Sequence, residues 1–306
     1  MPTDTSISPK FGVEIEFATP REGFAIADHL SAAGVSTAFE DYNHQVRHYW
    51  KVTTDSSCGL EVVSPPLEWH QRLTLRKVMQ VLRDLDCEIT KDCGFHVHHE
   101  WPWRDALPQS DKDERLLRLR KLYRSCEPLL RALMPASRWS GNTFCVFDPV
   151  PSQAAWPDVH CSECDSYNCS YCAECDCHDC YTHASEMEHS ERNRPCDDDI
   201  PRSSGEDLHQ NRYQAVNFVS LNRQPTVEFR QHQGTLNATK ALAWIELTRN
   251  FTHAASRPGL SDRERFDFIF DKLSTSTRRY LDERTTEAGV SLNTLVGASL
   301  RNWMAS

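Results

Sequence analysis

Residues 11–17 have the sequence Phe-Gly-Val-Glu-Ile-Glu-Phe, in which apolar side chains alternate with two acidic ones. In a β-strand, residues i and i+2 point to the same face. The stretch therefore predicts a strand that places the carboxylates of Glu14 and Glu16 side by side on one face of a sheet. The residues predicted to bury the other face are Val13, Ile15 and Phe17.

Two later stretches repeat this pattern with different side chains. His96 and His98 alternate with apolar residues in Gly-Phe-His-Val-His-His-Glu, and Glu228 and Arg230 do so in Thr-Val-Glu-Phe-Arg. Carboxylate oxygens with a little imidazole nitrogen are ligands suited to Mg²⁺ or Mn²⁺, and an arginine beside them suits a phosphate group. The three strands together predict phosphoryl-group chemistry. The residues predicted to bury their other faces are Phe95, Val97, Val227 and Phe229.

Each pair also has a purely structural explanation, because an antiparallel sheet with one wet face alternates apolar and polar residues. Two neighbouring glutamates on one face of an apolar strand, however, repel each other unless a cation lies between them. Strands also disfavour Asp and, less strongly, Glu. Three such strands in one chain, each with a different set of ligands, favour a functional site.

The composition limits the class of protein. The chain has 306 residues, of which 39% are hydrophobic and 25% charged, as in a soluble globular protein with a substantial core. A net charge of −10 argues against non-specific binding to nucleic acid or membranes, and no apolar run approaches the length that spans a bilayer. The first residues lack the basic and apolar regions of a secretory signal, so we expect a cytoplasmic protein. In that reducing location, 13 cysteines favour metal binding over disulfides.

The pattern of the chain is interrupted once, where residues 145–207 become rich in cysteine and then acidic and polar. We therefore predict a catalytic domain made of residues 1–144 and 208–306, with 145–207 as an insertion. Periodicity and capping signals predict helices over 20–33 (ended by Gly34), 68–86, 110–133, 238–255 and 266–273 (after a capping box at Ser261 and Glu264), and further strands over 47–54 and 60–63.

The insertion contains a dense cysteine cluster with the spacing of a metal site. Each Cys-x-x-Cys pair can wrap one tetrahedral ion, so eight thiolates could hold two structural Zn²⁺, with His160 or His178 able to replace a thiolate. An iron–sulfur cluster is a second interpretation, and a disulfide knot fits a reducing location poorly. The insertion is also a candidate surface for a substrate or protein partner. The predicted zinc ligands are Cys161, Cys164, Cys169, Cys172, Cys175, Cys177, Cys180 and Cys196.

A set of motifs runs through the chain in order: Gly12 to Phe17, Asp55-Ser56, Glu61 to Pro66, Gly94 to His98, Arg212 to Asn217, Thr226 to Arg230 and Gly234 to Asn237. Their order and spacing resemble the amidoligase family, which is related to the carboxylate–amine ligases typified by glutamine synthetase and glutamate–cysteine ligase. The resemblance spans most of residues 11–255 and leaves out the cysteine-rich insertion. One departure is Ser56-Ser57 after Asp55, where the family leads us to expect a glycine, and it bears on the role of Asp55.

This resemblance implies an α+β fold like that of glutamine synthetase, with a curved antiparallel sheet flanked by helices, to which the zinc-binding insertion is added. It also implies an ATP-dependent ligase. ATP would phosphorylate a substrate carboxylate, and an amine would then displace phosphate from the acyl phosphate to leave an amide. The chain has no Gly-x4-Gly-Lys-Ser/Thr loop, so the sheet itself would hold the nucleotide.

The resemblance to glutamine synthetase further implies two divalent cations, Mg²⁺ or Mn²⁺, that screen the like charges of ATP and the carboxylate. One ion would bridge the ATP phosphates and the other would lie nearer the acceptor. The implied ligands of the first ion are Glu14, His96 and Glu228, and those of the second are Glu16 and Glu61, with Asp55 as a further candidate.

Other residues receive roles in the same way. Arg230 and Arg212 would stabilise charge on the transferring phosphoryl group, and His98 would lie beside the nucleotide. The base that deprotonates the incoming amine stays open between Asp55 and Glu68. The substrates are predicted only as a small-molecule or peptide carboxylate and amine.

Two other functions stay open on the sequence alone. A metal-dependent hydrolase could use the same cluster, and it would cleave its substrate without nucleotide. A zinc-bearing interaction module on a degenerate ligase scaffold would bind no ATP. All metal-site residues of the motif are present, which disfavours the interaction module.

Overall fold

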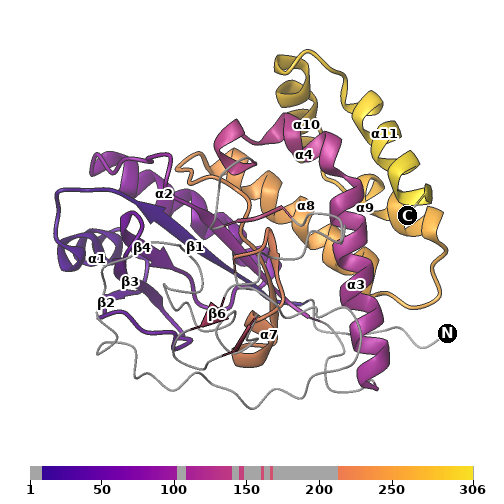
Figure 1. Cartoon of the computed structure of the whole chain (residues 1–306). Coiled ribbons are helices and arrows are strands. Elements are labelled where there is room, and N and C mark those ends of the chain that lie inside the picture. Colours follow the sequence, from indigo (N-terminus) through magenta and orange to yellow (C-terminus); the bar gives the residue numbers. More distant parts are fainter. Residues whose placement is uncertain are drawn as a thin grey trace.

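The computed structural model describes residues 9–101, 108–139, 145–147, 160–161, 166–167 and 213–305. A seven-stranded sheet forms its centre, and helices pack against this sheet (Figure 1). The strands are β1 (Phe11–Phe17), β2 (Thr37–Phe39), β3 (Trp50–Asp55), β4 (Gly59–Val63), β5 (Phe95–Glu100), β8 (Val216–Asn217) and β9 (Thr226–Phe229). Their order across the sheet is β2-β3-β4-β1-β5-β9-β8. The predicted combination of a sheet with flanking helices is confirmed.

The three strands that carry the polar pairs lie close together in this sheet. β1 pairs antiparallel with β5, and β5 pairs antiparallel with β9. The register places Glu14 opposite His96, and His98 opposite Glu228. Because residues directly opposite each other on neighbouring strands project to the same face, this register gathers the four side chains on one surface.

One strand departs from the predicted antiparallel sheet. β2 pairs with β3 in parallel, with Thr37 beside Trp50, whereas the other neighbouring strands of this sheet pair antiparallel. Parallel neighbours need a crossover connection rather than a tight turn, and residues 40–49 supply it here. The prediction of an antiparallel sheet is therefore wrong for this edge strand.

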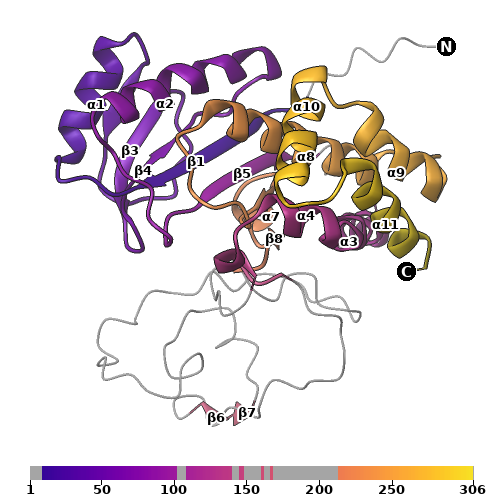
Figure 2. The same ribbon diagram turned by 90° about the horizontal axis from the view of Figure 1, so that it is seen from above.

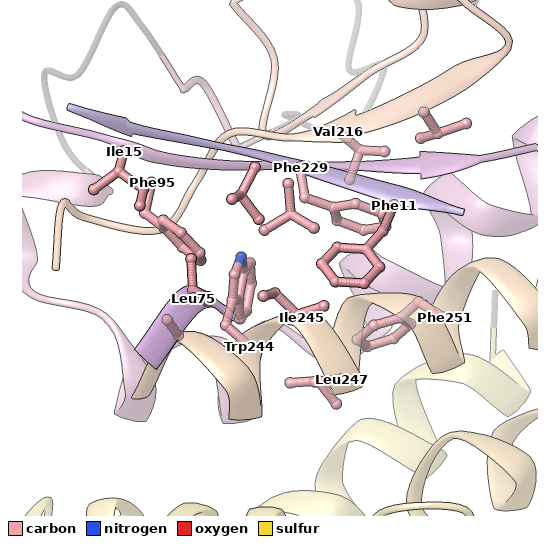
Figure 3. Packing of buried hydrophobic residues seen from close by; sticks show 14 of the residues in the cluster. Phe11, Ile15, Leu75, Phe95, Val216, Phe229, Trp244, Ile245, Leu247 and Phe251 are labelled. Carbon is pink, nitrogen blue, oxygen red and sulfur yellow. The ribbon is translucent and has the colours of Figure 1, made fainter. Parts of the chain in front are cut away.

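The apolar face of the sheet is covered by α1 (Gly23–Ala32), α2 (Thr74–Asp84) and α8 (Ala238–Ser256). Figure 3 shows Trp244 and Ile245 of α8 packed beneath Phe95 and Phe229 of the sheet. Complete burial of such a side chain stabilises the fold by about 1.5–3 kcal/mol. The strand residues predicted to be buried are all 1% exposed or less: Val13, Ile15, Phe17, Phe95, Val97, Val227 and Phe229.

A second layer of helices surrounds α8 (Figure 2). α3 (Gln109–Ser125), α9 (Asp262–Asp271) and α10 (Thr275–Glu287) contact α8 directly. α11 (Leu292–Ala305) contacts α3, α4 (Glu127–Leu133) and α9. Asn237 caps α8 through the amides of Thr239 and Lys240, which fixes where this central helix begins. The remaining helices of the described residues are η1 (Trp69–Leu73), η2 (Ala136–Arg138) and α7 (Ser220–Arg223).

The predicted helix over 110–133 is interrupted. α3 ends at Ser125 and α4 begins at Glu127, with Pro128 in the first turn of α4. Proline lacks an amide hydrogen and clashes with the preceding turn, so it is tolerated at the start of a helix and not inside one. The capping box of Ser261 and Glu264 and the left-handed backbone of Gly34, with φ of 78°, are confirmed.

The cysteine-rich segment is described only in part. A two-stranded sheet pairs β6 (His160–Cys161) with β7 (Ser166–Tyr167). Apart from the backbone of Cys161, the eight predicted zinc ligands lie outside the described residues. Val146 exchanges backbone hydrogen bonds with residues 213–215, so the chain leaves and re-enters the main body at neighbouring points. The division into a catalytic domain and an insertion stays a prediction.

Two cysteines outside the cluster form a disulfide between Cys58 and Cys93, whose Cα atoms are 5.3 Å apart. The sequence predicted metal binding rather than disulfides for the thiols, and that prediction is wrong for this pair. It missed the bond because the two residues are 35 positions apart and meet only through the fold. In the described part of the chain, no helix has the length and apolar character needed to cross a membrane.

Candidate functional site

Glu14, His96 and Glu228 converge on the polar face of the sheet from β1, β5 and β9. Each offers one ligand atom, and these three atoms lie within 4.8 Å of one another. His96 Nδ1 is 2.9 Å from Glu14 Oε2 and 3.6 Å from Glu228 Oε1. The three side chains are held there by strand register, so the hydrogen-bonded pairing of β1, β5 and β9 gathers the first predicted ligand set.

His98 lies beside the same two carboxylates. Its Nε2 is 3.3 Å from Glu14 Oε1 and 3.9 Å from Glu228 Oε1, while its Nδ1 is 3.2 Å from Thr226 Oγ1. Burial lowers the pKa of His98, but the carboxylates of Glu228 and Glu14 outweigh it and raise that pKa. Nε2 is buried with no well-directed hydrogen bond. A buried polar atom left in this state is costly, as expected where a ligand completes the site.

The carboxylates of Glu14 and Glu228 stay ionised despite their surroundings. Burial by itself would raise the pKa of Glu14, yet contacts with His96 and His98 hold that pKa well below its usual value. Burial opposes ionisation of Glu228 as well, and Arg230 is the main group that lowers its pKa. Both groups are therefore anionic near neutral pH, which metal ligation requires.

Glu228 is fixed through both of its oxygens. Arg230 NH1 donates to Oε1 at 2.5 Å, and Asn217 Nδ2 donates to Oε2 at 2.7 Å. Asn217 and Glu228 are 3% and 4% exposed, so this second bond is shielded from water. The sequence analysis included Asn217 in a family motif but assigned it no role. Its position opposite Glu228 follows only from the pairing of β8 with β9.

A second acidic group lies beside the first. Glu16 is opposite Glu61 in the pairing of β1 with β4. Glu16 Oε2 accepts a hydrogen bond from the amide of Gly94 at 2.5 Å, and its Oε1 is 3.4 Å from His96 Nε2. Burial and the carboxylates of Glu14, Asp55 and Glu16 raise the pKa of Glu61 well above its usual value. This excess of negative charge is what a divalent cation would relieve.

Asp55 stands at the end of β3, in the turn that leads to β4. Its Oδ1 accepts from the amide and hydroxyl of Ser57, at 2.8 and 2.5 Å, and from the amide of Cys58 at 2.8 Å. Ser57, part of the departure from the family pattern, thus holds the aspartate. Glu68, the other candidate base, forms the capping box of η1 with Gln71.

Lys51 is a site residue that the sequence interpretation missed. It is 3% exposed on β3, and its Nζ donates to the backbone oxygen of Asn43 at 2.6 Å. Burial lowers its pKa, while Glu61, Glu40 and Glu14 oppose that shift. Its parity was the available signal, because Lys51 shares a strand face with Asp55.

The described residues fit the predicted cations. Carboxylate oxygens and one imidazole nitrogen form a donor set suited to Mg²⁺ or Mn²⁺, and His98 and Arg230 border it. Arg212 lies outside the described residues. The other site residues predicted for the sheet are described, and they form two groups. Glu14, His96 and Glu228 form the first group. Glu16 and Glu61 form the second, and Asp55 is among the groups that raise the pKa of Glu61.

Comparisons with known proteins give one family match. Residues 8–252 match a family model described as "Putative amidoligase enzyme". No curated protein matches the chain. Among solved structures, a complex between the prokaryotic ubiquitin-like protein Pup and its ligase PafA matches with 11% identity and a TM-score of 0.32. That match covers 97% of this chain, which spans only 62% of the solved chain. A TM-score this low supports no inference about activity.

Proposed function

Because the chain belongs to the amidoligase family, we propose that it is an ATP-dependent ligase that joins a carboxylate to an amine. The observation that carries the proposal is the arrangement of Glu14, His96 and Glu228 beside Arg230 on one face of the sheet. Acidic ligands and a guanidinium are the groups that phosphoryl transfer needs. We propose accordingly that the sheet and its helices form a glutamine-synthetase-like fold.

The proposed reaction has two steps. A carboxylate is a poor electrophile because its leaving group would be oxide. The carboxylate oxygen attacks the γ-phosphorus of ATP, the bond to ADP breaks, and an acyl phosphate forms. The amine then attacks the acyl carbon, phosphate leaves with the C–O bonding pair, and the amine loses a proton to a base. The products are an amide, ADP and phosphate.

Each step uses groups on the polar face. Bound Mg²⁺ or Mn²⁺ would supply positive charge that offsets the charge of the phosphates. Arg230 lies against Glu228 Oε1, and a guanidinium in this position is proposed to bind a phosphoryl oxygen. His98 borders the same space and is proposed to contact the nucleotide. Arg212 is proposed to offset charge on the same phosphoryl group, and the eight cysteines of the insertion are proposed to bind structural Zn²⁺.

Asp55 is the better candidate for the base. Its carboxylate is among the groups that raise the pKa of Glu61, so it belongs to the second acidic group. The hydrogen bonds of the turn are made to its Oδ1. Glu68 is occupied as the cap of η1 and lies beside His70 at 3.3 Å. We propose that Asp55 accepts the proton of the amine and that Glu68 has a structural role.

The decisive assay measures phosphate released from ATP and Mg²⁺ in the presence of panels of carboxylates and amines, including peptides. We expect release that depends on both substrates. Turnover should be lost in folded Glu14→Ala, Glu61→Ala and Glu228→Ala variants and kept in Glu283→Ala, which changes an exposed glutamate. Normal turnover in the three site variants would reject the assignment, and cleavage of a substrate without ATP would instead identify a hydrolase.

A further inference from the structure

The disulfide between Cys58 and Cys93 joins two segments that both hold the second acidic group. Cys58 lies in the turn between β3 and β4, three residues after Asp55. Cys93 lies two residues before β5 and next to Gly94, whose amide holds Glu16. The bond therefore connects the backbone around one acidic side chain to the backbone around another.

The segment that contains Cys93 is firmly anchored. The Cys93 side chain is fully buried, and its backbone oxygen accepts from the amide of Gly234 at 2.6 Å and from the guanidinium of Arg138. Gly94 has little room: a Cβ there would lie 2.6 Å from His96 Nε2. The disulfide therefore ties Cys58 to a segment that other contacts hold in place.

The segment that contains Cys58 is a turn beyond the paired part of β1. The last residue of β1, Phe17, is opposite Leu60, so residues 55–59 extend past this register. Cys58 also contacts Thr90 Oγ1, but at 3.8 Å this interaction is weak. The amide of Cys58 donates to Asp55 Oδ1 together with the amide and hydroxyl of Ser57, so movement of this turn moves the groups that hold the aspartate.

We propose that Cys58 and Cys93 form a thiol–disulfide modification site that controls the second acidic group by fixing Asp55. The inference rests on the proposed function only for the identity of the cation that this group binds. In the oxidised protein the turn is tied to the anchored segment, and Asp55 stays beside Glu61. In the reduced protein the turn gains freedom and the group binds its cation more weakly.

The chemistry is a two-electron exchange with a dithiol. A thiolate of the dithiol attacks Cys58 Sγ, which is the partly exposed sulfur, and the S–S bond breaks. Cys93 leaves as a thiolate and takes up a proton. The second thiol of the reductant then displaces Cys58, which also becomes a thiol, and the reductant leaves as a cyclic disulfide. Three further cysteines among the described residues, Cys87, Cys126 and Cys145, are buried and form no disulfide, so within this part of the chain the dithiol reacts at the Cys58–Cys93 bond.

Two measurements on the full chain test the proposal, with the redox state checked by mass spectrometry after alkylation. Hydrogen–deuterium exchange of the peptide that covers residues 54–61 reports the freedom of the turn. Electron paramagnetic resonance of free Mn²⁺ reports cation binding. Reduction should raise exchange in that peptide and weaken the binding of one Mn²⁺ by about 10- to 100-fold, the range expected when a ligand loses its positioning.

Variants separate this bond from the other thiols. Cys58→Ser should behave like the reduced protein and show no further change with the dithiol, whereas Cys87→Ser should keep the wild-type redox response. Because Cys93 is fully buried, Cys58→Ser is the safer variant. Identical exchange and Mn²⁺ binding in oxidised and reduced wild type would overturn the proposal, and so would a full redox response in Cys58→Ser.

These outcomes are independent of the ligase assay. If no carboxylate and amine pair supports phosphate release in either redox state, the proposed function fails. The exchange and Mn²⁺ data still decide whether the disulfide controls the acidic group.

Discussion

Replacing Asn217 by alanine should weaken cation binding, although Asn217 itself is not a predicted ligand. The change removes the 2.7 Å hydrogen bond from Nδ2 to Glu228 Oε2. Both residues are at least 96% buried, so water cannot readily replace the donor. A hydrogen bond to a charged group contributes about 1.5–3 kcal/mol, and about 1.4 kcal/mol corresponds to a tenfold change in an equilibrium constant. We therefore expect Mn²⁺ affinity and ATP turnover to fall by roughly 10- to 100-fold.

The assay is the Mn²⁺ concentration that gives half-maximal phosphate release, measured together with the Mn²⁺ binding isotherm and the melting temperature. Asn222→Ala is the matched control, because Asn222 is an exposed asparagine on α7, five residues after Asn217. It should leave all three quantities unchanged. A folded Asn217→Ala protein with wild-type Mn²⁺ dependence would refute the reasoning. A lower melting temperature alone would show that Asn217 only stabilises the fold.

Two further changes probe the site and the pH dependence of stability. Gly94→Ala should reduce turnover and destabilise the fold by about 1–3 kcal/mol, because the added Cβ would lie 2.6 Å from His96 Nε2 and 3.3 Å from Glu16 Oε1; wild-type turnover and melting temperature would contradict this. Burial and two nearby guanidinium groups lower the pKa of Lys240 to about 8, so its destabilising effect is complete below pH 8 and is relieved as the pH rises toward the unfolded value. Lys240→Met should therefore raise the melting temperature at pH 7 more than at pH 10. Lys272→Met, at an exposed position, should leave the melting temperature unchanged at both pH values. An equal gain for Lys240→Met at pH 7 and pH 10 would show that the pKa of Lys240 is not lowered.

The local part of the site could be predicted from the sequence. Alternation along a strand is a property of neighbouring residues, so the shared face of Glu14 with Glu16 and of His96 with His98 follows from spacing alone. Burial of Ile15 on the opposite face follows from the same period, and it is fully buried.

The non-local part could not be predicted in this way. Which strands are neighbours, and in which register, depends on packing of the whole sheet. Asn217 gains its role only because β8 pairs with β9. Cys58 meets Cys93 only because the β3–β4 turn and the segment before β5 lie at the same end of the sheet. The parallel pairing of β2 likewise depends on the path of residues 40–49. The role of Lys51 could have been predicted, since the sequence predicts its strand and the face of the strand on which it lies.

Binding of a divalent cation between Glu14, His96 and Glu228 is tested most directly by titrating Mn²⁺ into the protein in the presence of ATP, with free Mn²⁺ followed by electron paramagnetic resonance. We predict that wild type binds Mn²⁺ tightly, that His96→Ala and Glu228→Ala each lose at least one bound ion, and that His70→Ala, an exposed histidine, binds like wild type. Unchanged binding in folded His96→Ala and Glu228→Ala proteins would contradict the proposed site.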